Sequence, residues 1–338
     1  MTQVGIPRGL FYFYQYPLWK TFFNDLGAEV ITSSPTSRKT IDHGIENTVD
    51  ECCLPIKVYF GHVSELIEKQ PDYILAPRLI STEMRSYICP KFMGVPDMIR
   101  ANWPDCPPLI DITVDCSRDT RQLWRDIYRV GGLFNGSKKS ILAAYEHGLR
   151  EMKRMRVWTR QGYSPLEAIE LWEKHGEAAA ESPDSDICVG VLGHGYSLYD
   201  PAISLQLTDK LRQMGCKVVF LESCLREHLE EEAARLPKKM FWTLGRKIVG
   251  SALVMDKSPE IDGIVYLACF GCGPDSMVGD IVARKVSHKP FMLVTIDEHS
   301  GEGGLVTRLE AFCDMLRRKK VQGFESDLSP YGFHAHSH

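Results

Sequence analysis

The sequence has no apolar run that approaches the roughly 20 residues a helix needs to cross a bilayer. Its opening, MTQVGIPRG, lacks the basic-then-apolar layout of a signal peptide and predicts a β-strand instead. Lysine and arginine are scattered and the formal net charge is −4, so the chain offers no basic patch for nucleic acid. These absences predict a cytoplasmic protein with no membrane and no nucleic-acid partner.

Two nucleotide-binding fingerprints are missing as well. The chain contains neither the phosphate loop G-x-x-x-x-G-K-[ST] nor the dinucleotide pattern G-x-G-x-x-G. We therefore expect that this chain binds no nucleotide. If its chemistry depends on ATP, another protein must hydrolyse it.

The order of apolar segments predicts an α/β fold. The 338 residues suggest two domains of ordinary size. Short apolar runs such as VGIP, DYILAP, ICVGVLG and DGIVYLA alternate with amphipathic segments, which is typical of parallel sheets. The halves share a plan, since FFNDLGAEV in the first matches LRQMGCKVV in the second. We predict two Rossmann-like lobes with parallel sheets, joined by a helical connector.

The expected domain boundaries follow from composition. The segment ESPDSD, 181–186, is the clearest linker. The predicted divisions are an N-terminal lobe (1–117), a helical connector (118–185), a C-terminal lobe (186–325) and a tail (326–338). Ligands of open sheets gather beyond the carboxyl ends of the strands, so we expect the site in the cleft between the lobes.

Eleven cysteines are many for a compartment that keeps thiols reduced. An odd count at irregular spacings argues against a disulfide framework. Cys188, Cys216, Cys224 and Cys313 lie in or beside apolar or helical segments and are expected to be structural. The remaining cysteines have three possible explanations: inert buried thiols, a metal site or redox chemistry.

Three stretches pair a cysteine with proline or glycine: CCLPIK, ICPKF and CFGCGPDS. Such turns leave backbone N–H groups free to stabilise a sulfur anion, and Cys53 and Cys272 are expected at helix N-termini, where the dipole does the same. Zinc is an alternative, because Cys269-x-x-Cys272 is half of a zinc-knuckle spacing, but no second C-x-x-C exists. A thioredoxin-like redox pair is another, although no thioredoxin pattern surrounds CFGC. The pattern favours an iron–sulfur cluster.

Five motifs, in order from residue 4 to about 315, carry a resemblance to a known family: GIPRGLFYFYQYPLWKTFFNDLGAEV, DECCLPIKVYFGHV, YICPKFMGVPD, FGCGPDS and DEHSGEGGLVTRLEAF. On these motifs the chain resembles stand-alone proteins related to activators of CoA-substrate-specific enzymes, a branch of the 2-hydroxyacyl-CoA dehydratase and benzoyl-CoA reductase superfamily. The spacing Cys53-x-x-x-Lys57-x-x-x-Gly61 is similar to a recurring element of that superfamily.

The resemblance implies a [4Fe–4S] cluster held in the cleft by three thiolates. Carried over to this chain, these are Cys53, Cys89 and Cys272. Three protein ligands leave one iron open, which suits chemistry better than simple electron storage.

Additional cysteines extend this pattern. A subgroup of the superfamily holds a double-cubane [8Fe–9S] cluster on six cysteines, and this chain adds Cys52, Cys116 and Cys269. We favour the double cubane on this basis. The alternative is that the three are ordinary buried thiols around one cubane. Cys106, in WPDCPP, is an alternative to Cys116.

Two lysines follow the cysteines closely. Lys57 and Lys91 are expected to offset the negative charge of a reduced cluster or to bind a substrate anion. The alternative is that both are ordinary solvated lysines. Asp275 and Ser276 resemble a helix cap, and capping alone would explain them.

Three further residues are candidates for cleft chemistry. Glu298 and His299, in the DEH stretch that begins at Asp297, end the last strand, and His194 follows an earlier one. Their position is the only argument for a general-acid or substrate-binding role, so the catalytic residues stay unassigned.

The resemblance also implies a partner: a separate dimeric activator ATPase with its own [4Fe–4S] cluster. Plant-type ferredoxins work near −400 mV, and moving one electron roughly 300 mV lower costs on the order of 7 kcal/mol, which ATP hydrolysis can supply. We therefore expect an oxygen-sensitive homodimer that reduces a small-molecule substrate. The alternatives are a CoA-thioester dehydratase or reductase component with one cubane, and a non-enzymatic iron–sulfur carrier.

Overall fold

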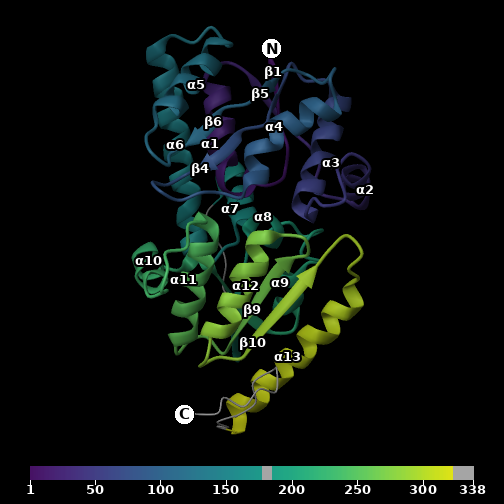
Figure 1. Cartoon of the computed structure of the whole chain (residues 1–338), viewed down its shortest axis with the longest axis vertical. Coiled ribbons are helices and arrows are strands. Elements are labelled where there is room, and N and C mark those ends of the chain that lie inside the picture. Colours follow the sequence, from purple (N-terminus) through teal and green to yellow (C-terminus); the bar gives the residue numbers. More distant parts are fainter. Residues whose placement is uncertain (177–184, 323–338) are drawn as a thin grey trace.

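The computed structural model describes residues 1–176 and 185–322. The tail predicted at 326–338 and most of the predicted linker lie outside these ranges. Figure 1 shows two lobes, one holding the N-terminal elements and the other the strands β7 to β10, with the helix α7 where they meet. The domain boundaries given above remain predictions.

Each lobe is built on a four-stranded parallel sheet. The first sheet has the order β2-β1-β3-β5 and the second β10-β9-β7-β8. In both, the first strand of the lobe lies between the second and third, so the predicted likeness of the halves is confirmed as α/β lobes with one strand order. The strands of the first sheet are β1 (Gln3–Ile6), β2 (Glu29–Thr32), β3 (Tyr73–Leu75) and β5 (Leu109–Ile110). Those of the second are β7 (Ile187–Gly193), β8 (Cys216–Phe220), β9 (Gly263–Cys269) and β10 (Phe291–Ile296).

The central strands are apolar along their whole length because helices cover both faces of the sheet. Every residue of β9 is buried, for example. A separate two-stranded parallel sheet pairs β4 (Arg78–Ser81) with β6 (Thr113–Asp115). It extends the first lobe toward the cysteine-bearing loops.

The helices fill the connections between these strands. Those of the first half are α1 (Tyr12–Asp25), α2 (Arg38–Glu46), α3 (Leu54–Lys69), α4 (Pro90–Asn102), α5 (Arg121–Gly132), α6 (Lys138–Arg160) and α7 (Pro165–Glu173). Those of the second half are α8 (Gly195–Leu198), α9 (Leu207–Gln213), the 3₁₀ turn η1 (Leu221–Ser223), α10 (Arg226–Ala234), α11 (Thr243–Lys257), α12 (Gly273–Lys285) and α13 (Glu302–Gln322). No helix in the described ranges is both long and apolar enough to cross a membrane.

One expected helix is shorter than its apolar pattern indicated. The pattern at 201–215 predicts a continuous helix, but only α9 forms there, after a series of turns. Leu205 and Gln206 have φ angles of 52° and 55°, and residues in this left-handed region cannot continue a right-handed helix.

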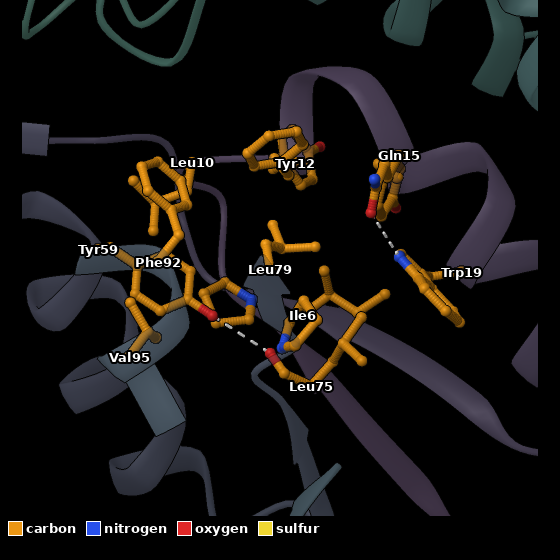
Figure 2. A pocket seen from close by; sticks show the side chains of 15 residues that line it. Ile6, Leu10, Tyr12, Gln15, Trp19, Tyr59, Leu75, Leu79, Phe92 and Val95 are labelled. Atoms are coloured by element: carbon orange, nitrogen blue, oxygen red, sulfur yellow. Dashed lines mark hydrogen bonds between the residues drawn. The ribbon is translucent and has the colours of Figure 1, made fainter. Parts of the chain in front are cut away.

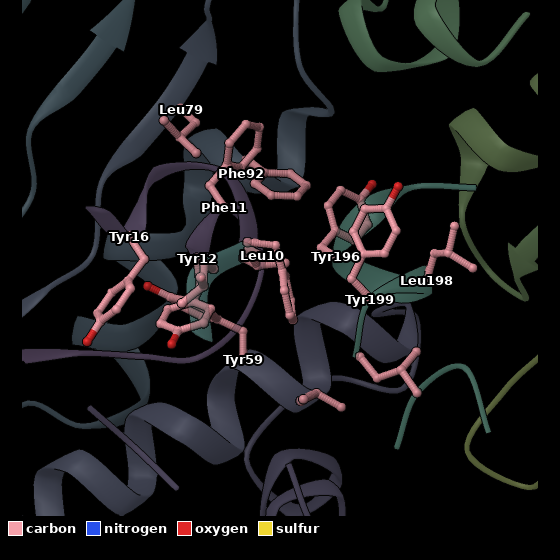
Figure 3. Packing of buried hydrophobic residues seen from close by; sticks show 14 of the residues in the cluster. Leu10, Phe11, Tyr12, Tyr16, Tyr59, Leu79, Phe92, Tyr196, Leu198 and Tyr199 are labelled. Atoms are coloured by element: carbon pink, nitrogen blue, oxygen red, sulfur yellow. The ribbon is translucent and has the colours of Figure 1, made fainter. Parts of the chain in front are cut away.

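Aromatic side chains fill the space where the lobes meet. Phe92 of the first lobe lies 5.3 Å from Tyr196 of the second, measured between ring centroids, and Phe11 lies 5.4 Å from Phe92. Figure 3 shows Phe11 and Phe92 facing Tyr196 and Tyr199. The lobes therefore share one continuous apolar core on this side.

Candidate functional site

Three of the predicted ligand cysteines immediately precede helices. Cys53, Cys89 and Cys272 are the N-cap residues of α3, α4 and α12. Each helix has a proline in its first two positions, where a missing N–H costs least: Pro55, Pro90 and Pro274. Each sulfur therefore lies at the positive end of a helix dipole, which favours a thiolate or a bound anion. The prediction that Cys53 and Cys272 begin helices is confirmed.

Cys53 and Cys272, which come from different lobes, shift the pKa of each other through a hydrogen bond. The pKa of Cys53 is lowered to about 7, chiefly because the Cys272 thiol donates a hydrogen bond to it, although burial opposes the shift. The pKa of Cys272 is raised, because the donated proton is held by the neighbouring sulfur and because the thiol is buried. Thiol ligands of a metal must be deprotonated, and the hydrogen bond from Cys272 favours the deprotonated form of Cys53.

Cys89 belongs to the same cluster of thiols. Burial raises its pKa, the backbone N–H and the charge of Lys91 lower it, and the thiolate of Cys53 raises it. The three cysteines also act on Tyr196: burial raises its pKa well above the usual value, and the nearby Cys272, Asp275, Cys53 and Cys89 raise it further. We call Cys53, Cys89 and Cys272 the thiol cluster below.

Cys52 and Lys91 lie at the edge of the thiol cluster. Cys52 is 6% exposed, and burial raises its pKa while the Lys91 charge lowers it. The Lys91 ammonium donates to the Glu51 carbonyl at 2.6 Å, which fixes it beside the first turn of α3. Its cation acts on Cys52, Cys53 and Cys89 together. This is the placement that a role in offsetting negative charge requires.

Cys269 and Cys116 have different surroundings from the thiol cluster. Cys269 ends β9, and its buried thiol donates to the Ser197 hydroxyl at 3.3 Å. Cys116 follows β6; burial and Asp115 raise its pKa, and its sulfur acts on Tyr145 of α6. Cys269 is thus near the thiol cluster, since Asp275 and Cys53 also raise its pKa, whereas none of the three cluster cysteines shifts the pKa of Cys116.

Cys106, the alternative to Cys116, lies beyond the end of α4. Burial raises the pKa of its thiol, while Arg100 lowers it. Its neighbours are thus the charged groups at the far end of α4, whose first residue follows Cys89.

A buried hydrogen-bond network centred on Asp275 lies next to Cys272. The Asp275 carboxylate accepts from Tyr266 at 2.7 Å and from the Cys269 N–H at 3.1 Å, and lies 2.6 Å from His194 Nδ1. Burial raises the pKa of Asp275, but the His194 charge and these hydrogen bonds outweigh it and lower the pKa. Asp275 therefore joins β9 to the residue before α8, and capping of its own helix does not describe its role.

Donor atoms of His194, Cys272 and Asp275 all lie within 4.8 Å of one another. Each residue is buried, and His194 is also stacked on Tyr196 with ring centroids 5.0 Å apart. His194 thus lies inside the protein at the N-cap of α8, where its pairing with Asp275 satisfies one ring nitrogen.

The lysine that follows Cys53 forms an ion pair between the lobes. Lys57 Nζ lies 2.6 Å from Glu298 Oε1, with the side chains 4% and 18% exposed. Burial raises the pKa of Glu298, but the hydrogen bond and charge of Lys57 bring it below the usual value. His299 is exposed, and its backbone N–H donates to Asp297 at 3.0 Å. Glu298 therefore pairs with the lysine of the opposite lobe, whereas His299 is exposed to solvent.

An apolar pocket lies on the other side of Phe92. Figure 2 shows its walls, with Tyr59 donating to the Leu75 carbonyl at 3.3 Å and Trp19 donating to Gln15 at 3.1 Å. Its volume is about 40 Å³, and its lining comes from the carboxyl ends of β1 and β3, from α1 and from α4. The pocket holds at most a few atoms, and Phe92 separates it from Tyr196 at the thiol cluster.

Sequence reasoning missed two members of this site. Tyr196 carries no motif signal, because only the folded chain brings it against sulfurs from both lobes. The sequence indicated the role of Asp275 only weakly. An acidic residue in the first turn of a helix, three residues after Cys272, is usually interpreted as part of the helix cap.

Fold and site together define a class: a two-lobed α/β protein with a buried thiol cluster contributed by both lobes. The family model described as "CoA enzyme activase uncharacterised domain (DUF2229)" matches residues 3–224, and the chain belongs to this family. The matched span contains Cys53 and Cys89 and ends before Cys272. No curated protein matches the chain.

Proposed function

We propose that this chain binds an iron–sulfur cluster of the [4Fe–4S] type through Cys53, Cys89 and Cys272. The observation that carries the proposal is that three helix-start cysteines from two lobes lie close enough to shift the pKa of one another and of Tyr196. The donor set fits the group, because thiolates are its usual ligands and helix N-termini favour their negative charge. Burial of the sulfurs, with Cys53 and Cys272 8% and 6% exposed, also fits an oxygen-sensitive group.

When bound, such a cluster supplies one-electron transfer, and with three protein ligands it keeps one iron open. The protein's own groups set its surroundings. Lys91 brings a positive charge to the sulfurs, and His194 and Tyr196 are buried and stacked on each other. The Lys57–Glu298 ion pair joins the two lobes close to Cys53.

We further propose that the protein works in low-potential electron transfer to a small substrate, with electrons from a separate ATPase. The family's description supports a role beside a CoA-dependent enzyme, and the missing nucleotide fingerprints support a second protein for ATP hydrolysis. A carrier that hands over its cluster should present its ligands at the surface, and the buried sulfurs favour the electron-transfer role.

A six-thiolate [8Fe–9S] cluster is the second candidate. The adjacent Cys52, beside Cys53 and under the same lysine, favours it. It also requires Cys269, whose pKa the nearby Cys53 raises, and Cys116, whose pKa is raised by burial and Asp115 and by none of the three cysteines. Three-thiolate binding is therefore the proposal that the geometry supports best.

The deciding experiment is anaerobic purification followed by iron, zinc and acid-labile sulfide analysis. The proposal expects about four iron and four sulfide per chain, lost in air. About eight iron would favour the six-thiolate cluster instead. Stoichiometric zinc without iron would refute both, and would turn attention to the His194, Cys272 and Asp275 group.

A further inference from the structure

The loop that carries Cys89 is held by the opposite lobe. The Tyr87 N–H donates to the Phe241 carbonyl at 2.8 Å, and the Thr243 N–H donates to the Tyr87 carbonyl at 2.9 Å. Tyr87 and Trp242 thereby form an isolated parallel β-bridge. Two residues of extended chain reach at most about 7 Å, so Cys89 cannot move far while this bridge holds.

A buried arginine fastens the same loop from the side. The Arg246 guanidinium, on α11, donates to the Glu83 carboxylate, to the Ser86 hydroxyl at 2.7 Å and to Glu230 at 3.0 Å. Its side chain is 8% exposed and that of Glu83 is 16% exposed. Glu83 and Ser86 belong to the Cys89 loop, whereas Glu230 belongs to α10. One guanidinium therefore joins the loop to two helices of the second lobe.

The helix that holds this loop also contacts the helix that begins at Cys272. A Cβ atom added at Gly245 of α11 would lie 2.8 Å from Val278 Cγ2 of α12. The two helices are thus in close contact, and α12 starts directly after Cys272. A continuous set of contacts runs from the Cys89 loop through α11 and α12 to Cys272.

We propose that Arg246 is a positioning residue: it clamps the Cys89 loop onto α11 and so keeps the Cys89 sulfur near Cys53 and Cys272. A role in metal binding rests on the proposed iron–sulfur cluster. The contacts of Arg246 themselves do not depend on bound iron. If the two lobes separated, Cys89 would move away from Cys272. Arg246 opposes this separation by holding the Cys89 loop to α11.

The test compares two arginines that contact the same carboxylate. Arg246→Met removes the buried clamp. Arg226→Met removes a guanidinium that also lies 3.2 Å from Glu83 but has a side chain 69% exposed. Both are prepared in metal-free, reduced protein, and the alkylation rate of Cys89 by iodoacetamide is measured by peptide mass spectrometry, with Cys188 as the internal reference.

We expect Arg246→Met to raise the Cys89 rate by about tenfold relative to Cys188, because the loop opens more readily. Arg226→Met should stay within about twofold of wild type, since exposed ion pairs contribute little. Arg246→Lys keeps the charge but not the fork, so it should fall between wild type and Arg246→Met. Equal Cys89 rates in wild type and Arg246→Met would overturn the proposal.

Should Arg246→Met fail to fold, the amide of Tyr87 decides the matter. Its hydrogen exchange is measured in wild type and in Glu83→Gln, which keeps the shape of the side chain. Faster exchange at Tyr87 in Glu83→Gln supports the clamp, and unchanged exchange refutes it.

Iron binding measured in parallel separates this inference from the proposed function. A wild type that takes up no iron, with Cys89 still released by Arg246→Met, refutes the cluster and leaves the clamp. A wild type with iron, and an Arg246→Met variant with the same iron content and the same electron paramagnetic resonance spectrum, refutes the positioning role alone.

Discussion

At the level of single residues, the Cys53–Cys272 pair is the feature that best distinguishes the candidate site from other thiols of the protein. The two thiols come from different lobes, and the pKa of Cys53 is lowered to about 7, chiefly because Cys272 donates a hydrogen bond to it. Cys216 and Cys313 form another close thiol pair, with sulfurs 3.4 Å apart, but between β8 and α13. What distinguishes the first pair is its position at two helix N-termini, with Cys89 and Lys91 beside it.

We expect Cys53→Ser, Cys89→Ser and Cys272→Ser each to abolish most cluster absorbance, because a serine hydroxyl is a poor substitute for a thiolate. The matched control is Cys188→Ser. Cys188 lies in β7, and burial raises its pKa to about 11, as expected for a structural thiol. Iron content and visible absorbance after anaerobic purification are the measurements. Iron lost from Cys188→Ser as completely as from Cys53→Ser would show that the division between ligand and structural thiols is wrong.

Among the elements, α2 and α3 are joined by two glycines at which their backbones come into close contact. A Cβ atom at Gly61 of α3 would lie 1.8 Å from the Thr40 carbonyl oxygen, and one at Gly44 of α2 would lie 1.9 Å from the Lys57 carbonyl oxygen. Only glycine allows the two backbones to approach this closely. The contact holds the helix that begins after Cys53 and carries Lys57.

Gly61→Ala should therefore destabilise the protein, by about 1–3 kcal/mol, because a methyl group forces the two helices apart. The control is Gly94→Ala in α4, where the added Cβ would meet only the Met98 sulfur, at 3.8 Å. There the higher helix propensity of alanine should leave stability unchanged or raise it by up to about 1 kcal/mol. Urea unfolding of the metal-free proteins measures both. A Gly61→Ala variant as stable as Gly94→Ala would contradict the close packing of α2 on α3.

At the scale of the whole molecule, two sets of ionic contacts join the lobes near the thiol cluster. One is the Glu83 and Arg246 contact, and the other is the Lys57–Glu298 pair. Both involve chain segments that carry cluster cysteines of the first lobe. The two lobes are thus held together by these ion pairs, whose cations are buried, and by aromatic packing between Phe92 and Tyr196.

Glu298→Gln should lower stability at pH 7 by about 1–3 kcal/mol, because it leaves the Lys57 ammonium buried without a counter-charge. The folded-state pKa of Glu298 is lowered, so the contribution of its charge is fully present above the unfolded-state pKa. That contribution is lost as the pH falls through the folded-state pKa. The stability difference between wild type and variant should therefore shrink between about pH 5 and pH 3. Urea unfolding across this range measures it, and a difference independent of pH would show that the pair does not act through its charge.

The protein alone should not hydrolyse ATP. The sequence has no phosphate-loop fingerprint, and under the proposed function a separate ATPase supplies the electrons. With dithionite and ATP we expect no phosphate release and little substrate reduction, and with a cluster-bearing activator ATPase we expect ATP-dependent reduction of a small test substrate. ATPase activity of the purified chain would overturn this division of labour. Turnover of a CoA thioester only would favour the dehydratase or reductase alternative.

The sequence alone determined the fold class and the shared plan of the lobes. Apolar runs such as ICVGVLG and GIVYLAC form buried parallel strands, because local hydrophobicity and β-branching are read directly from neighbouring residues. It also placed Cys53 and Cys272 at helix starts, since a proline in the first turn is a local signal. It misjudged the helix at 201–215, where Leu205 and Gln206 take left-handed φ angles that their residue types do not announce.

The resemblance named Cys53, Cys89 and Cys272 together, but only the tertiary structure decided which groups surround them. These three cysteines from two lobes all act on Tyr196, whereas Cys116, which the sequence added to the set, acts on Tyr145. The interlobe contacts of Lys57 and Arg246 were equally hidden, since their partners lie 241 and 163 residues away. Local patterns act over a few residues, but the distances between sulfurs depend on how whole sheets and helices pack, and that is set by the summed contacts of the folded chain.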